Sequence, residues 1–297
     1  MLHAVTLVAP PDAVFVPETV VTHALAAEGA RVVGRRVLGD RAVDLMVEAA
    51  EGALGGLRRT VEASVKHFPL DACVQPADGR RKRLLIADMD STIIGCECLD
   101  ELADFAGVKT QVAAITERAM RGELAFEAAL RERVAMIKGL PLGDLERCFV
   151  ERVRLNPGAR TLALTMAADG ARCVLVSGGF TFFAARVAEA AGFHAARANW
   201  LKQAAGVLTG EVGEPILGRE AKLQALQEET AALGVDAFQA LAIGDGANDL
   251  AMIEAAGLGI AYRAKPVVAE RAAARIDRGD LTAALHFQGY REDEFVR

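Results

Sequence analysis

Two carboxylates, Asp88 and Asp90, stand at the end of a short apolar run. Leu84-Leu85-Ile86-Ala87 leads directly into Asp88, and Asp90 follows after one residue. An apolar run that stops at polar residues is typical of a buried parallel strand whose carboxyl end opens into a crevice, where open α/β sheets bind ligands. A strand followed by an ordinary turn would also place aspartates here. This stretch alone therefore leaves a catalytic pair and a turn as alternatives.

A second run of the same kind could bind an anion. Cys173-Val174-Leu175-Val176 leads into Ser177-Gly178-Gly179. Serine offers a hydroxyl, and two glycines allow backbone N–H groups to approach an anion ahead of a helix with a positive amino end. A common strand-to-helix turn would have the same sequence. Lys222, in the first turn of a helix predicted over 219–233, opposes the helix dipole and should face an anion unless it is merely solvated.

A third run combines acids with an amide. Leu241-Ala242-Ile243 leads into Gly244-Asp245-Gly246-Ala247-Asn248-Asp249. Carboxylate and amide oxygens are what a hard divalent cation binds, and further polar groups orient them. The alternating acids and closing glutamate of an EF-hand calcium loop are missing, which excludes that kind of site. Because the carboxyl ends of parallel strands meet at one edge of a sheet, we expect all three runs to contribute to one pocket.

Composition limits the classes of protein to consider. The chain has 297 residues, of which 52% are hydrophobic, enough for two packed domains. Its net charge of -6 argues against broad nucleic-acid binding. No apolar run reaches the roughly 18 to 20 residues of a membrane span, and the amino terminus lacks a signal-peptide pattern. Five cysteines do not suggest a disulfide framework, so we expect a cytoplasmic protein without nucleic-acid or membrane partners.

The first 79 residues contain none of these polar strand ends. Their pattern predicts strands and helices in β-α-β-β-α-β order, at residues 3–9, 17–29 (entered through Pro17), 31–37, 42–48, 54–67 and 71–76. This order is the ferredoxin-like α+β plan and is similar to small ACT-type ligand-binding domains. Two roles stay open for this domain: a packing module that can join two copies as a homodimer, and an amino-acid sensor. Arg80-Arg81-Lys82-Arg83 is interpreted as a solvated linker to a second domain, residues 80–297.

A helical insertion is predicted directly behind the first polar strand end. The pattern indicates helices over about 97–155, starting near Glu97, Lys109, Glu123 and Asp144, which would form a lid over the pocket. One helix carries an apolar stripe at helical spacing: Phe126, Leu130, Val134 and Ile137. Arg133 lies on that stripe and must meet an anion, because an unpaired charge among apolar neighbours is costly. An internal salt bridge and a ligand contact are both open.

Four segments, in this order, resemble the motifs of the haloacid dehalogenase superfamily phosphatases: Asp88-Met89-Asp90-Ser91-Thr92, Ser177-Gly178-Gly179-Phe180, Lys222 and Gly244-Asp245-Gly246-Ala247-Asn248-Asp249. The resemblance covers about residues 82–290. It implies a Rossmann-like parallel sheet with a helical cap inserted at about 97–155. Within the superfamily, the phosphoserine phosphatases are most similar, since their contacts to the substrate's amino group, backbone and carboxylate match Glu97, Met120, Phe126 and Arg133.

The same resemblance implies a reaction and a role for each residue. The expected enzyme is a Mg²⁺-dependent phosphomonoester hydrolase that converts O-phosphoserine to serine and phosphate, the last step of serine biosynthesis. Asp88 would attack phosphorus to give an aspartyl-phosphate, and Asp90 would protonate the leaving oxygen and later deprotonate water. Asp88, the backbone carbonyl of Asp90 and Asp245 would bind Mg²⁺. Substrate would also meet Ser177, Gly178, Gly179, Lys222 and Asn248, while Asp249 would orient its neighbours.

Two other functions remain as alternatives. A phosphotransferase, or a phosphatase for another small phosphorylated metabolite, would keep the same chemistry and change the substrate or acceptor. A regulatory protein that senses an amino acid through its amino-terminal domain belongs to a different class.

Overall fold

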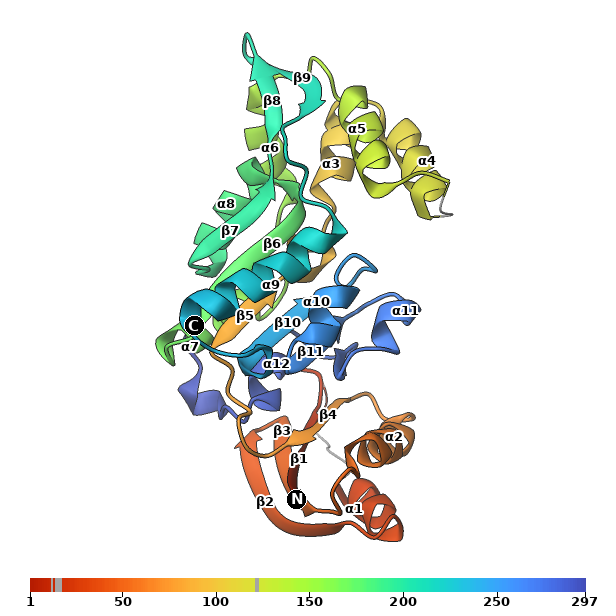
Figure 1. The fold of residues 1–297 in the computed structure, drawn as a ribbon, viewed down its shortest axis with the longest axis vertical. Helices are drawn as coiled ribbons and strands as arrows, with labels where there is room; N and C mark the ends of the chain where they lie inside the picture. The colour runs from red at the N-terminus through yellow and green to blue at the C-terminus, as the bar shows by residue number, and fades with distance from the viewer. Residues whose placement is uncertain (12, 14–17, 121–122) are drawn as a thin grey trace.

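A long twisted sheet runs through the molecule (Figure 1). The computed structural model describes residues 1–297 except 12, 14–17 and 121–122. Within the described residues, ten strands pair in the order β2 (Arg31–Gly39), β3 (Ala42–Glu48), β1 (Leu2–Val8), β4 (Asp71–Pro76), β12 (Ala274–Ile276), β11 (Leu258–Tyr262), β10 (Ala240–Gly244), β5 (Leu84–Ala87), β6 (Arg172–Phe180) and β7 (Ala195–Asn199).

From β12 to β7 the sheet is parallel and is covered on both faces. Alternate residues of β5 point to opposite sides, as the two-residue period of a strand requires. Leu85 and Ala87 pack into a cluster with α7 (Ala159–Ala168), α8 (Thr181–Ala191) and α12 (Ala283–Phe287). Leu84 and Ile86 pack into another with α9 (Arg219–Leu233), α10 (Leu250–Ala255) and α11 (Pro266–Ala269). Burial on both faces explains why β5 is apolar throughout.

The register of the parallel strands brings the three polar strand ends together. Ala87 of β5 pairs with Ile243 of β10 on one side and with Leu175 of β6 on the other. The residues that follow these positions therefore leave the sheet at the same edge. The prediction of a Rossmann-like parallel core with polar groups along one edge is confirmed.

The amino-terminal strands continue the sheet in antiparallel fashion. They lie in the order β2-β3-β1-β4, with α1 (Glu18–Ala27) and α2 (Leu54–Val65) packed together against them. The described elements follow the predicted β-α-β-β-α-β order, although Pro17 lies outside the described residues. Cys73 of β4 pairs with Ala274 of β12, so one sheet joins this unit to the core. A domain division at residues 79 and 80, and an ACT-like character of the first unit, stay predictions.

The cap stands apart from the sheet at the top of Figure 1. It holds the four predicted helices: α3 (Cys98–Phe105), α4 (Lys109–Met120), α5 (Phe126–Met136) and α6 (Leu142–Arg152). The hairpin of β8 (Leu201–Ala204) and β9 (Val207–Val212) packs on α5, and the Gly139 N–H donates to the carbonyl of Leu208 at 2.8 Å. A second segment, far along the chain, therefore belongs to a cap that was predicted as purely helical. No helix within the described ranges is long and apolar enough to cross a membrane.

The interpretation of Arg80-Arg81-Lys82-Arg83 as a solvated linker is wrong for two of its residues. Only 9% of Arg80 and 3% of Lys82 is exposed. Arg80 donates to both carboxylate oxygens of Asp44 in β3, at 2.7 and 2.9 Å, and to the carbonyl of Phe287 in α12 at 3.0 Å. Because Asp44 is fully buried, it needs such a cation. The linker side chain therefore ties the amino-terminal strands to the core.

Arg80→Met should destabilise the protein by about 3–5 kcal/mol, because it leaves the Asp44 carboxylate buried and unpaired. Urea unfolding followed by circular dichroism measures this. Arg83→Met, at an exposed position of the same run, is the control and should change the free energy of unfolding by no more than about 0.5 kcal/mol. Equal effects of the two substitutions would contradict a structural ion pair at Arg80.

Candidate active site

A buried lysine lies between two carboxylates at the carboxyl edge of the sheet. Lys222, in the first turn of α9, places Nζ 2.5 Å from Oδ1 of Asp88 and 2.5 Å from Oδ1 of Asp249. All three residues are at most 5% exposed. Burial lowers the pKa of Lys222, but the charges of Asp249 and Asp88 more than offset this and hold it above its ordinary value. The sequence predicted that Lys222 faces an anion, and in the structure it faces two carboxylates.

Asp88 keeps a raised pKa in spite of this partner. Burial is the largest cause, and the neighbouring Asp249 adds to it, while Lys222 acts in the opposite direction. Asp88 directly follows β5 and its N–H donates to the carbonyl of Ile243 at 3.0 Å, which fixes its backbone to β10. The carboxylate is thereby held at the sheet edge with one oxygen on Lys222.

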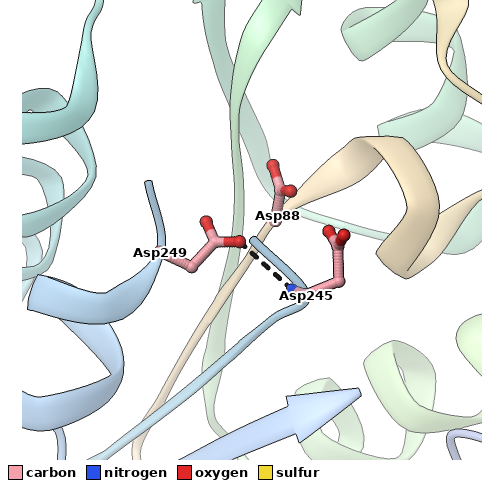
Figure 2. A group of neighbouring side chains, drawn as sticks. All are labelled: Asp88, Asp245 and Asp249. Carbon is pink, nitrogen blue, oxygen red and sulfur yellow. Dashed lines mark hydrogen bonds between the residues drawn. The ribbon is translucent and has the colours of Figure 1, made fainter. Parts of the chain in front are cut away.

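Three acids form a group that could hold a metal ion. Asp88, Asp245 and Asp249 each offer an oxygen within 4.8 Å of the others, and Figure 2 shows them grouped around the ends of β5 and β10. Asp249 is already engaged, because its Oδ2 accepts the N–H groups of Asp245 and Gly246 at 3.1 and 3.0 Å while Oδ1 accepts Lys222. Asp88 and Asp245 are left with oxygens to offer, which fits the oxygen preference of Mg²⁺.

Asp245 is oriented by a residue that the sequence reasoning did not single out. Thr92 donates its hydroxyl to Oδ1 of Asp245 at 3.2 Å, and burial raises the pKa of Asp245. Thr92 is itself fully buried, and its carbonyl accepts the side-chain amide of Asn156 at 2.8 Å. In the sequence, Thr92 stood out only as the last residue of the Asp88-Met89-Asp90-Ser91-Thr92 motif, without a role of its own.

Asp90 lies in a tight turn, Met89–Ile93, that follows β5. Its Oδ1 accepts the Cys98 N–H at 3.0 Å, and its Oδ2 accepts the Ser177 hydroxyl at 3.3 Å. Burial raises its pKa, which favours a protonated side chain that can act as an acid. A Cβ on Gly179 would lie 2.8 Å from Asp90 Oδ2, so a side chain there would displace the Asp90 carboxylate.

Ser177 and Gly179, two of the predicted anion-binding residues, lie beside Asp90 in a part of β6 where the pairing with β7 is irregular. The Gly179 N–H donates to Ser177 Oγ at 2.9 Å, so the two predicted residues are in direct contact. Asn248, on the other side of the site, is half-buried. Its Oδ1 would be 2.4 Å from a Cβ on Gly246, so a side chain there would displace the Asn248 amide.

The cap contributes a carboxylate and a guanidinium that have no partner of opposite charge within 4.0 Å in the described ranges. Glu97 Oε1 accepts the Ser91 hydroxyl at 2.6 Å, and burial, followed by the charge of Asp90, raises the pKa of Glu97 to about 7. Arg133 donates to the Ala129 carbonyl at 3.2 Å and weakly to the Thr116 hydroxyl at 3.4 Å. The internal salt bridge that was one alternative for Arg133 is thus absent among the described residues.

Phe126 brings the cap into contact with the core. A Cβ added to Gly178 would lie 3.3 Å from the tip of the Phe126 ring, and one added to Gly218 would lie 3.6 Å from its edge. The ring therefore sits between the Ser177-Gly178-Gly179 segment and the start of α9. Met120 ends α4, but its side chain lies outside the described residues.

A family model, a curated relative and a solved structure all relate this chain to the haloacid dehalogenase-like hydrolases. The family model described as haloacid dehalogenase-like hydrolase matches residues 85–254. A phosphoserine phosphatase of Polaromonas sp. is 46% identical over 208 residues, 68% of this chain and 88% of that protein. A HAD family hydrolase from Salmonella enterica serovar Typhi aligns over 96% of this chain and 98% of its own, with a TM-score of 0.83 and 30% identity.

A solved structure described as a phospho-aspartyl intermediate analogue of phosphoserine phosphatase is also similar. It is 37% identical, with a TM-score of 0.65, and the alignment covers 70% of this chain and 99% of that one.

Lys222→Met should destabilise the metal-free protein by about 3–5 kcal/mol, because two buried carboxylates would lose their shared cation. Urea unfolding in EDTA measures this. Lys202→Met removes an exposed pair with Glu211 at 2.9 Å and should cost at most about 1 kcal/mol. A Lys222→Met protein as stable as the Lys202→Met control would show that the buried ion pairs do not exist in solution.

Proposed function

Because this chain belongs to the haloacid dehalogenase-like hydrolase family, as its motifs predict, we propose that it hydrolyses O-phosphoserine to serine and phosphate. Its relative from Polaromonas sp. carries the name phosphoserine phosphatase, which supports this substrate.

One observation in the structure carries the choice of substrate. Glu97 and Arg133 offer a negative and a positive charge, and neither has an oppositely charged partner within 4.0 Å in the part of the chain that the structure describes. A free amino acid ester brings an ammonium and a carboxylate, which are the complementary groups. Burial lowers the pKa of Arg133, and the charges of Asp100 and then Glu97 oppose this, so both acids act electrostatically on Arg133. The cap is therefore suited to the amino-acid half of phosphoserine.

The sheet edge is suited to the phosphoryl half. In the first step the Asp88 carboxylate attacks phosphorus, the bond between phosphorus and the serine oxygen breaks, and Asp90 gives its proton to that oxygen. In the second step Asp90 takes a proton from water, which attacks phosphorus and releases Asp88 and inorganic phosphate. The 37% identical solved structure is described as a phospho-aspartyl intermediate analogue, which supports an aspartyl-phosphate on Asp88.

Charge on the phosphoryl group has to be offset during both steps. Lys222, 2.5 Å from Asp88, supplies a cation, and Ser177, 3.3 Å from Asp90, supplies a hydroxyl donor. Asp88, Asp245 and the backbone carbonyl of Asp90 would hold Mg²⁺, which neutralises phosphoryl charge when it is bound. Gly178, Gly179 and Asn248 complete the proposed binding site, and Asp249 fixes Lys222 and the Asp245 backbone.

The compartment and the pathway of the enzyme form part of the same proposal. We propose that the enzyme acts at the end of serine biosynthesis. We also propose that it works in the cytoplasm, and the five free cysteines support a reducing compartment. Pairing of two copies through the amino-terminal unit, and amino-acid sensing by that unit, stay predictions from the sequence.

Asp88→Asn should lower phosphate release from O-phosphoserine by about 10³-fold or more, because the nucleophile is removed. EDTA should abolish release by the unchanged protein, and added Mg²⁺ should restore it. Asp78→Asn, at an exposed position, is the control and should keep full activity. Turnover that survives Asp88→Asn or EDTA would rule out the mechanism.

Arg133→Ala separates phosphoserine from other small phosphate esters. It should reduce kcat/KM for phosphoserine about 10²-fold, since a charged hydrogen-bonded pair contributes about 1.5–3 kcal/mol. Hydrolysis of phosphoethanolamine, which keeps the ammonium and lacks the carboxylate, should change little. Arg131→Ala on the same helix is the control, because Arg131 is exposed and pairs with Glu214. Equal losses on both substrates would assign Arg133 a structural role and leave the substrate open.

A further inference from the structure

The phosphoryl-binding segment of β6 is a bulge. Val176 pairs with Arg197 of β7, and the next pair is Phe180 with Asn199. Three residues of β6, Ser177 to Gly179, therefore stand against a single residue of β7. A bulge of this kind lifts backbone groups out of the ladder and leaves them without strand partners. The shape of this segment must be held by something other than the sheet.

The side chain of Asn199 replaces a lost ladder partner. Its Nδ2 donates to the Gly178 carbonyl at 2.9 Å, and Asn199 is only 1% exposed. The same Nδ2 donates to the Leu217 carbonyl at 3.3 Å, and its Oδ1 accepts the Leu217 N–H at 2.7 Å. Both amide hydrogens and the oxygen are thus used. The Leu217 N–H needs an acceptor, which fixes which end of the amide is oxygen.

The second partner of Asn199 leads to the catalytic lysine. Leu217 precedes Gly218, which caps α9, and Lys222 is the fourth residue of that helix. One buried amide therefore connects the backbone of the bulge to the start of the helix that presents Lys222 to Asp88. The Phe126 ring would lie 3.3 Å from a Cβ on Gly178 and 3.6 Å from one on Gly218, so both connected segments face the same cap side chain.

We propose that Asn199 is a positioning residue for phosphoryl transfer. It sets the Ser177–Gly179 bulge against α9 so that the Ser177 hydroxyl and the Lys222 ammonium converge on the same phosphoryl group. Hydrogen-bond donors that are held ready for the transition state lose much of their effect when even a small displacement moves them away from the reacting atoms. This proposal rests on the phosphatase function proposed above. The alternative is that Asn199 only satisfies buried backbone groups and contributes to stability.

Asn199→Asp tests the proposal in the full chain with Mg²⁺ present. The substitution keeps the shape of the side chain and turns an acceptor toward the carbonyls of Gly178 and Leu217. We expect kcat for phosphoserine to fall about 10- to 100-fold, below the 10²–10³-fold loss of a donor itself, with KM changed less than about threefold. Orthovanadate mimics the transition state. Its affinity, measured by calorimetry, should fall by the same factor as kcat/KM.

Gln288→Leu is the matched control, because Gln288 is another buried amide that binds backbone groups, the Lys82 N–H and the Ala284 carbonyl, and lies outside the proposed site. It should lower the melting temperature and leave kcat and orthovanadate affinity unchanged. Asn199→Ser decides the matter if Asn199→Asp does not fold, since serine is polar, smaller and uncharged. Asn199 variants that lose only stability, as Gln288→Leu does, would overturn the proposal.

The same experiment separates this proposal from the proposed substrate. If the unchanged protein hydrolyses p-nitrophenyl phosphate and not phosphoserine, the proposed substrate is wrong, and the Asn199 variants are compared on p-nitrophenyl phosphate and orthovanadate. A parallel loss of both readouts in those variants still supports the positioning role, and unchanged values still contradict it.

Discussion

The site depends on one ammonium group shared by two buried carboxylates. Lys222 comes from α9, Asp88 from the end of β5 and Asp249 from the start of α10, so a single pair of contacts at 2.5 Å fixes three segments relative to one another. Charges this deeply buried persist only when they are paired. The nucleophile proposed for the reaction is consequently held in place before any substrate or metal arrives, with one oxygen on the lysine and the other left to act.

Around this group, the charged side chains of the site come from two parts of the molecule, the sheet edge and the cap. The sheet edge gathers acids, a lysine and a serine, which suit a phosphoryl group and a cation. The cap supplies Glu97 and Arg133, which suit an amino acid. Phe126 joins the two halves, because its ring faces Gly178 of β6 and Gly218 at the start of α9. The phosphomonoester of a small amino acid that we propose as substrate would use both halves at once.

The sequence predicted the core well because β5, β6 and β10 are buried on both faces, which makes each of them a short apolar run ending in polar residues. Arg80 escaped prediction because its partner, Asp44, lies 36 positions earlier and only the folded sheet brings them together. Asn199 and Thr92 were missed for a similar reason, since their partners Gly178 and Asp245 lie 21 and 153 positions away. The β8–β9 hairpin joins the cap by packing against α5, a contact between distant segments that only the folded chain makes.

The proposed mechanism depends on covalent chemistry at Asp88, which can be tested by trapping the aspartyl-phosphate intermediate. The Mg²⁺-loaded protein would be mixed with phosphoserine, quenched within one turnover and reduced with borohydride, which converts an aspartyl-phosphate to homoserine. Peptide mass spectrometry should then find homoserine at position 88 and nowhere else. Reduction at a different residue, or an unmodified Asp88 in protein that was turning over when quenched, would contradict the account.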